Sequence, residues 1–260
     1  MFTLQRYFLY ILSCLLFPVC LSAQNRIHDA NTIGWYAYFG DHKLSDKWAI
    51  HTEYQWRRID LIRSWQQSLA RAGIQYSLTD HIKTSAGYTL LLGFPYGRFP
   101  ESEAGVPNPE HRMYQDIDLE QTTGRLQLTH RFRLEQRWMS TWPDTGGDQS
   151  PGWQYQNRAR YRIRGALPLG QPTMDEANWY LTAYDELFIG FGPNVQLDIF
   201  DQNRIFLGLG YRFSPSFRLE AGFLNQVVQH AEADPATRLP VMERNNGFTL
   251  SVYGDLDFRR

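Results

Sequence analysis

Cysteine is almost missing from this chain. Its two cysteines, Cys14 and Cys20, both fall within the first 20 of the 260 residues. If this segment is removed during export, the rest of the chain is free of cysteine and has no disulfide framework. A small disulfide-rich scaffold is therefore excluded, and the fold must be stabilised in another way.

The first 23 residues have the layout of a secretory signal peptide. The basic Arg6 precedes an apolar run, and the small residues Ser22 and Ala23 follow that run. An uncleaved anchor is the alternative, but the run is shorter than the ~20 residues that a spanning helix needs. We expect cleavage after Ala23, which leaves residues 24–260 as one exported domain.

Long apolar runs and a charge excess are missing as well. After residue 23 no apolar run of ~18 residues recurs, which excludes membrane-spanning helices. The 26 Lys and Arg residues nearly balance the 27 Asp and Glu residues, so no basic excess indicates a nucleic-acid partner. The sequence also lacks a His-x-x-x-His pair, a Gly-rich phosphate loop and a nucleophile elbow. We expect neither a metal nor a cofactor.

What the sequence does contain is arginine at every second position. In "RARYRIRG" (158–165), four arginines alternate with Ala159, Tyr161 and Ile163. Successive side chains of a strand point to opposite faces, so a strand here has a cationic face and an apolar face. A helix would spread the same arginines around its circumference. Either the arginines face water on a soluble β-protein, or they face the lumen of a membrane barrel.

The same alternation recurs along the chain. Apolar and polar residues alternate in "KWAIHTEYQWR" (47–57), "RLQLTHRFRLEQRW" (125–138) and "RIFLGLGYRF" (204–213). Aromatic residues make up 15% of the chain and include 8 Trp, as expected for a barrel with aromatic girdles. Short connections are expected at 40–46, 78–81, 123–124 and 214–216, and long ones at 94–110, 139–152 and 231–244.

These patterns predict an all-β fold: a single transmembrane antiparallel β-barrel with short periplasmic turns and long outer loops. We count eleven strands, the first of which starts on the outer side, but single-chain bacterial barrels have an even number. We therefore expect twelve strands, the missing one within 24–31 or 192–200, and keep ten as the alternative count. A soluble periplasmic β-protein is the alternative to a membrane barrel.

Two hairpins allow the register of the strands to be predicted. A two-residue turn at 123–124 places Glu120 opposite Gln127, Asp118 opposite Thr129 and Asp116 opposite Arg131. A three-residue link at 214–216 places Arg212 opposite Arg218, Gly210 opposite Glu220 and Phe213 opposite Phe217. In both hairpins the polar faces of the two strands coincide, as a half-buried sheet requires.

Five segments resemble those of a known family. They are "HRFRLEQRW" (130–138), "NRARYRIR" (157–164), "YDELF" (184–188), "FDQNRIFLGLGYRFSP" (200–215) and "RLEAGFLNQ" (218–226). In order and spacing they resemble the domain of unknown function 2490 family, exported Gram-negative proteins regarded as outer-membrane β-barrels. The resemblance implies this location and fold over nearly the whole mature chain, and it implies no reaction, ligand or catalytic residue.

The predicted inner wall carries acidic and basic groups in turn. Carboxylates occur at 116–120, arginines at 131–164, and carboxylates again at Asp185 and Glu186. Like charges ~7 Å apart on one strand repel each other unless neighbouring strands compensate them. We expect a network of Arg–carboxylate pairs that is structural or leaves a narrow, porin-like pore. The predicted members are Asp116, Asp118, Glu120, Arg131, Arg133, Glu135, Arg137, Arg158, Arg160, Arg162, Arg164, Glu186, Arg212 and Glu220.

Two other functions stay open. If the arginines exceed their carboxylate partners, the positive wall would favour small anions, and the barrel would be an anion-preferring channel. A lipid-facing outer-membrane hydrolase is the other alternative, because His130 and Asn157 fall on apolar faces of neighbouring strands. No outward serine lies beside them, since Ser140 belongs to a loop, so we expect no catalytic residue.

The expected partners follow from the location. They are outer-membrane lipid and the barrel-assembly machinery, with small anions as a further candidate and no nucleic acid. Assembly machinery commonly reads an aromatic residue at the end of the last strand, and Phe258 is the predicted signal here. Arg259 and Arg260 follow it, so the chain departs from a terminal Phe.

Overall fold

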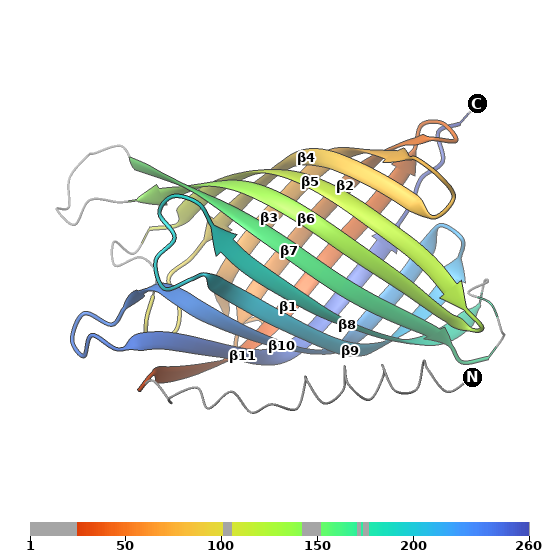
Figure 1. The fold of residues 1–260 in the computed structure, drawn as a ribbon. Helices are drawn as coiled ribbons and strands as arrows, with labels where there is room; N and C mark the ends of the chain where they lie inside the picture. The colour runs from red at the N-terminus through yellow and green to blue at the C-terminus, as the bar shows by residue number, and fades with distance from the viewer. Residues whose placement is uncertain (1–24, 101–105, 142–151, 171–172, 174–176, 260) are drawn as a thin grey trace, which may run out of the picture.

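The computed structural model describes residues 25–100, 106–141, 152–170, 173 and 177–259, and the predicted signal peptide lies outside them. The described residues form a closed barrel of tilted strands (Figure 1) without any α-helix, and therefore without a helix that could cross a membrane. The strands are β1 (Ile27–Lys43), β2 (Trp48–Ile59), β3 (Ser64–Ser77), β4 (Ile82–Gly93), β5 (Asn108–Thr123), β6 (Leu126–Thr141), β7 (Gly152–Pro168), β8 (Asn178–Phe191), β9 (Phe200–Ser214), β10 (Phe217–Ala233) and β11 (Pro240–Gly254).

The barrel closes with an odd number of strands. Neighbouring strands in the chain pair antiparallel, but β1 and β11 pair in parallel, from Ile27 opposite Val241 to Phe39 opposite Tyr253. The prediction of twelve strands is therefore wrong, and the count of eleven is right. Of the two stretches suspected of hiding a strand, 27–31 belongs to β1, and 192–199 forms turns between β8 and β9.

The connections divide the barrel into two ends. At the end we call the turn end, β1–β2, β3–β4, β5–β6 and β9–β10 are joined by two to four residues. At the other, the loop end, residues 94–107 join β4 to β5 (left in Figure 1). The predicted long connection at 231–244 is wrong, because β10 and β11 extend toward each other and leave only residues 234–239 between them. The connection predicted at 139–152 lies largely outside the described residues.

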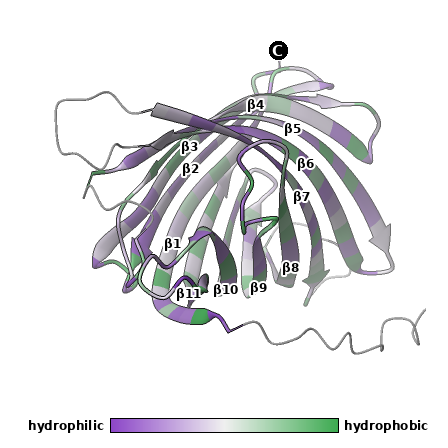
Figure 2. Ribbon diagram, turned by 60° about the vertical axis from the view of Figure 1, so that its left-hand side comes forward, coloured by the Kyte–Doolittle hydropathy of each residue, from purple (hydrophilic) through white to green (hydrophobic). Residues whose placement is uncertain are grey.

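The alternation of side chains places apolar groups outside and polar groups inside. Hydrophilic and hydrophobic residues alternate along the strands (Figure 2). On β9, Leu207 is 60% exposed on the outer wall, whereas Arg204, three positions earlier, is 9% exposed inside. This pattern repeats around the wall, because every strand has one inward and one outward face.

Of the two predicted registers, one is right except next to its turn, and the other is wrong. Arg212 lies opposite Arg218 and Gly210 opposite Glu220, as predicted, but a register shift places Phe217 opposite Ser214 and not opposite Phe213. In the β5–β6 hairpin the register is shifted by two residues, so Asp118 lies opposite Arg131. A shift of two residues keeps both faces, so hydrophobicity alone could not distinguish the two registers. The turn geometry decides between them: Gly124 has a φ of 60°, which starts a tight turn at residues 124–125.

Candidate functional site

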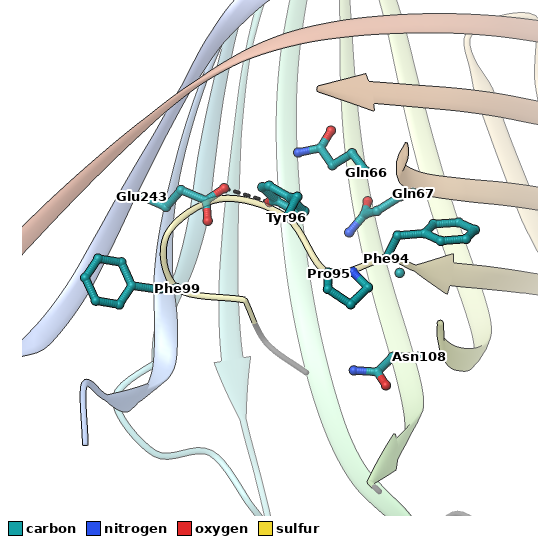
Figure 3. Close-up of a pocket in the computed structure, with 9 residues that line it drawn as sticks. Gln66, Gln67, Phe94, Pro95, Tyr96, Phe99, Asn108 and Glu243 are labelled. Atoms are coloured by element: carbon teal, nitrogen blue, oxygen red, sulfur yellow. Dashed lines mark hydrogen bonds between the residues drawn. The ribbon is translucent and has the colours of Figure 1, made fainter. Parts of the chain in front are cut away.

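The lumen is the candidate functional site, and its loop end is covered by the connection between β4 and β5. This segment carries Tyr96 to the opposite wall, where its hydroxyl donates a hydrogen bond of 2.7 Å to Glu243 on β11 (Figure 3). Glu243 also lies 3.1 Å from Nε2 of His230. The backbone N–H of Arg98 faces Asp29 at 3.4 Å. A small cavity of about 30 Å³ lies next to Tyr96 and Glu243. The connection therefore narrows the mouth of the barrel.

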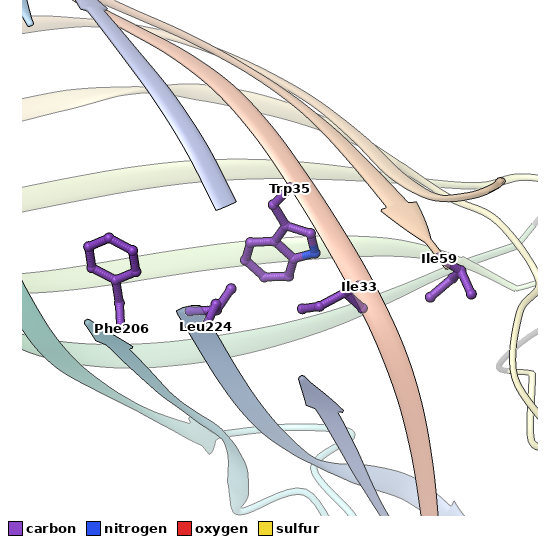
Figure 4. Close-up of a cluster of buried hydrophobic side chains, with 5 residues drawn as sticks. All are labelled: Ile33, Trp35, Ile59, Phe206 and Leu224. Atoms are coloured by element: carbon purple, nitrogen blue, oxygen red, sulfur yellow. The ribbon is translucent and has the colours of Figure 1, made fainter. Parts of the chain in front are cut away.

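A small apolar cluster lies inside the barrel next to this mouth. Tyr96 and Tyr184 pack against it, so it touches both the loop segment and the wall of β8. Because its members come from β1, β2, β9 and β10, they hold one side of the barrel together from within. They are Ile33, Trp35, Ile59, Phe206 and Leu224 (Figure 4).

An ionic layer fills the opposite wall. Both Nε and Nη2 of Arg133 donate to the carboxylate of Asp116 at 2.5 Å, and Arg131 donates to Asp118 at 2.7 Å. Glu135 is fully buried and accepts from both Arg158, at 2.6 Å, and Arg160, at 2.7 Å. Each of these carboxylates thus pairs with at least one arginine of the neighbouring strand, which is the arrangement that a buried ion pair needs.

The other predicted members occupy several positions. Arg160 also pairs with Glu186 at 2.6 Å, Arg164 pairs with Glu220, and Arg137 pairs with Glu110 and Asp201. Glu120 lies at the exposed turn end, where it pairs with Lys83, and Arg212 donates to the backbone carbonyls of Ser214 and Pro215. Arg162 has no carboxylate within 4.0 Å among the described residues.

Several inward charged residues were missed from the sequence. Apart from Asp201, they alternate in the same way as the predicted ones, so the periodicity of β2, β3, β5, β9 and β11 could have identified them. Asp201 lies at a register shift between β8 and β9, where the adjacent Gln202 is buried as well. Among them, Arg71 pairs with Glu53, and Arg112 donates to Glu110 at 2.6 and 2.7 Å. The missed residues are Glu53, Arg57, Arg71, Glu110, Arg112, Asp201, Arg204 and Glu243.

Aromatic rings inside the lumen separate the arginines. The guanidinium of Arg133 lies 4.6 Å from the ring centroid of Tyr114, and those of Arg160 and Arg204 lie 4.4 and 4.7 Å from that of Phe188. Cation–π contacts of this kind stabilise a guanidinium away from water. The sequence alternation assigned aromatic residues mainly to the outer face, so these inward rings were not predicted.

A central cavity of about 90 Å³ remains between the apolar cluster and the ionic layer. Eight arginines and three glutamates line it. Its three carboxylates, on Glu53, Glu186 and Glu220, are already paired with Arg71, Arg160 and Arg164. The cavity has room for a few water molecules or one small ion, and its wall has an excess of positive charge.

The outer wall does not bring the candidate hydrolase residues together. His130 contacts the hydroxyl of Tyr161 at 2.8 Å, whereas Asn157 accepts from the hydroxyl of Tyr155 at 2.7 Å. His130 lies opposite Ile163, six positions from Asn157 along β7, a separation of roughly 20 Å.

Asp185 also lies on the outer wall, next to Asn203, so its assignment to the lumen is wrong. Adjacent residues of a strand face opposite sides, and Glu186 is the one that points inward.

The predicted assembly signal lies beyond the last strand. Strand β11 ends at Gly254, and Phe258 follows it as an exposed residue. Its backbone N–H donates to the carbonyl of Lys43 at 2.9 Å, so the terminal segment continues along the end of β1.

The described residues contain no group of three His, Cys, Asp or Glu side chains that could hold a metal ion.

Comparison with known proteins adds one result to this geometry. Searches of curated proteins and of solved structures give no match. A family model described as "Protein of unknown function (DUF2490)" matches residues 32–237, which include all of β2 to β10 and most of β1. The chain therefore belongs to the DUF2490 family.

Proposed function

We propose that this chain is an outer-membrane β-barrel protein with a lumen closed by its own side chains. The observation that carries the proposal is the inverted polarity of the wall. Large apolar residues such as Phe132, Ile205 and Phe223 are about half exposed outside, while Glu135 and Arg158 are buried inside. In water such an apolar surface would promote association, whereas lipid tails solvate it.

Aromatic clusters at both ends of the outer wall support a membrane location. At the turn end, Trp179 packs on Tyr211 with ring centroids 4.8 Å apart. At the loop end, Trp65 stacks on Phe94 at 5.1 Å, and Trp138 packs on Tyr155 at 5.2 Å. Aromatic girdles at the two membrane interfaces flank the apolar band of outer-membrane barrels.

The lengths of the strands are consistent with a bilayer. The shortest have 12 residues and the longest have 17. A tilted strand crosses the hydrocarbon core with about 9–11 residues, so each strand is long enough to span it. We place the turn end in the periplasm and the loop end outside, as is usual for such barrels.

Closure of the lumen is supported by three features: the β4–β5 segment at the loop end, the apolar cluster on one side of the lumen and the ionic layer on the opposite wall. Wild-type protein refolded into planar bilayers is expected to give no steady conductance. Stepwise openings in most insertions would contradict a closed lumen. Fractionation and heat-modifiable gel mobility test the location separately, and recovery of a freely soluble periplasmic protein would contradict it.

An anion-preferring channel for small solutes is the second candidate. It is favoured by Arg57, Arg162 and Arg204, which line the central cavity without a carboxylate within 4.0 Å among the described residues. In this case the wild type would conduct, and its reversal potential under a salt gradient would show anion preference. Replacing Arg160 and Arg162 by Gln would lower that preference. Conductance without ion preference would exclude this candidate.

A further inference from the structure

Three arginines of the central cavity differ from all the others that line it. The guanidinium groups of Arg71, Arg112, Arg131, Arg133 and Arg160 each lie within 4.0 Å of a carboxylate. Those of Arg57, Arg162 and Arg204 do not, although all three line the same cavity. A buried charge is costly unless an opposite charge or several acceptors compensate it.

Arg57 and Arg204 meet at a single aromatic ring. The guanidinium of Arg57 lies 4.0 Å from the ring centroid of Trp35, and that of Arg204 lies 4.9 Å from the same centroid. The indole stabilises each cation, but it does not neutralise either charge. Two guanidinium groups on one ring therefore leave a concentrated positive potential beside the cavity.

Neutral amides occupy only some of the N–H groups of these arginines. Arg57 donates to Gln55 at 2.6 and 2.8 Å and to Gln67 at 2.5 Å. Within the part of the chain that the structure describes, Arg204 donates only from Nη2, to Gln202 at 3.2 Å, and its Nε is buried without an acceptor. The Nε of Arg162 is likewise buried without an acceptor. Most of the donors of Arg204 and Arg162 thus face no oxygen among the described residues.

We propose that the central cavity binds one small free oxyanion between Arg57 and Arg204. The oxygens of this anion accept hydrogen bonds from the unused N–H groups of Arg204 and from the remaining N–H groups of Arg57. Arg162 adds positive charge from the wall of β7. The planar fork of a guanidinium suits sulfate, phosphate or a short carboxylate.

The size and position of the cavity define the ligand further. A volume of about 90 Å³ accommodates a tetrahedral or planar oxyanion and excludes nucleotides and sugar phosphates. The phosphate of a lipid headgroup is excluded as well, because its acyl chains cannot enter a lumen lined by charged groups. The site would exist in a soluble barrel with the same lumen, so it does not depend on the proposed membrane location or on conduction.

Equilibrium dialysis of the refolded protein in detergent micelles against radiolabelled sulfate tests the site. The wild type is expected to bind a single sulfate per chain in the low-millimolar range or below, with phosphate and acetate as competitors. Arg57→Gln and Arg204→Gln are expected to weaken sulfate binding about tenfold or more, because each substitution removes charge-assisted hydrogen bonds to the anion. Arg63→Gln, which removes the same charge from the exposed β2–β3 connection, is the matched control and should bind like the wild type.

Two results would overturn the proposal. One is the absence of saturable sulfate binding by the wild type. The other is equal affinity of the wild type, Arg57→Gln and Arg204→Gln. If a Gln variant does not regain heat-modifiable mobility, Arg204→Lys is tested in its place, because lysine keeps the positive charge and lacks the planar guanidinium fork. A low concentration of sulfate should raise the melting temperatures of the wild type and of Arg63→Gln. It should raise the melting temperature of Arg204→Lys by a smaller amount. Equal shifts in all three proteins would contradict the site.

Discussion

Neighbouring residues of β6 face opposite environments. Arg133 is buried against Asp116 inside the barrel, and the next residue, Leu134, is 39% exposed on the outer wall. Leu134 lies near the middle of its strand, where a bilayer would be most apolar. A substitution of Arg133 therefore tests the ion pairs of the lumen, and a substitution of Leu134 tests whether the outer wall faces lipid or water.

Leu134→Arg is expected to destabilise the barrel in lipid vesicles by about 2–4 kcal/mol, the cost of an arginine on the lipid face near the midplane. Arg133→Leu is expected to cost about 3 kcal/mol, because among the described residues the buried Asp116 then keeps one ion pair, with Arg131 at 3.8 Å. Urea unfolding in vesicles measures both. A change of less than about 0.5 kcal/mol for Leu134→Arg, as at an exposed site in water, would contradict the membrane proposal.

Gly210 leaves room for an inward aromatic ring. A Cβ atom at this position would lie 2.1 Å from Cζ of Tyr180, whose hydroxyl donates to Glu220 at 2.9 Å. We expect Gly210→Val to displace the ring and destabilise the barrel by about 1–3 kcal/mol. The double variant Gly210→Val with Tyr180→Ala should regain part of this loss in the same unfolding assay. Fully additive losses would mean that the ring and the glycine do not share this space.

At the scale of the strand, β11 holds the barrel closed on both sides. It pairs antiparallel with β10 and in parallel with β1. Deleting residues 248–260 removes about half of each ladder, and we expect it to abolish heat-modifiable mobility and insertion. Deleting only 257–260 removes Phe258 and leaves β11 intact. If the shorter deletion alone blocks insertion in cells but not refolding in detergent, Phe258 acts as a signal for the assembly machinery. Normal insertion of the longer deletion would contradict closure by β11.

The strands differ in how far the sequence could predict them. The faces of β6, β7 and β9 follow from a period of two, because each strand has one apolar and one polar side. The partner of Asp116 does not follow, since Arg131 and Arg133 face the same side and only the turn at Gly124 decides between them. The end of β10 was missed because its last residues are polar and its partner strand starts at Pro240, both of which are typical of a loop.

At the scale of the whole molecule, the odd number of strands separates the two ends of the chain. β1 starts at the loop end, and β11 finishes at the turn end. Single cysteines test this arrangement with a membrane-impermeant maleimide on intact cells. Asn25→Cys and Ala236→Cys are expected to react, whereas Asp80→Cys in the β3–β4 turn should react only after the outer membrane is permeabilised. If Asn25→Cys behaved like Asp80→Cys, the first strand would not run parallel to the last.

The parallel pairing of β1 with β11, which we call the seam, also affects the rate at which the barrel folds and the place at which it unfolds under force. Parallel ladders are slightly less stable per residue than antiparallel ones. The seam joins the two strands that are farthest apart in the chain, so its closure carries the largest loss of chain entropy. We therefore expect the encounter of these two strands to be the slow step of folding. Under a pulling force, we expect the wall to separate along this line before any hairpin opens.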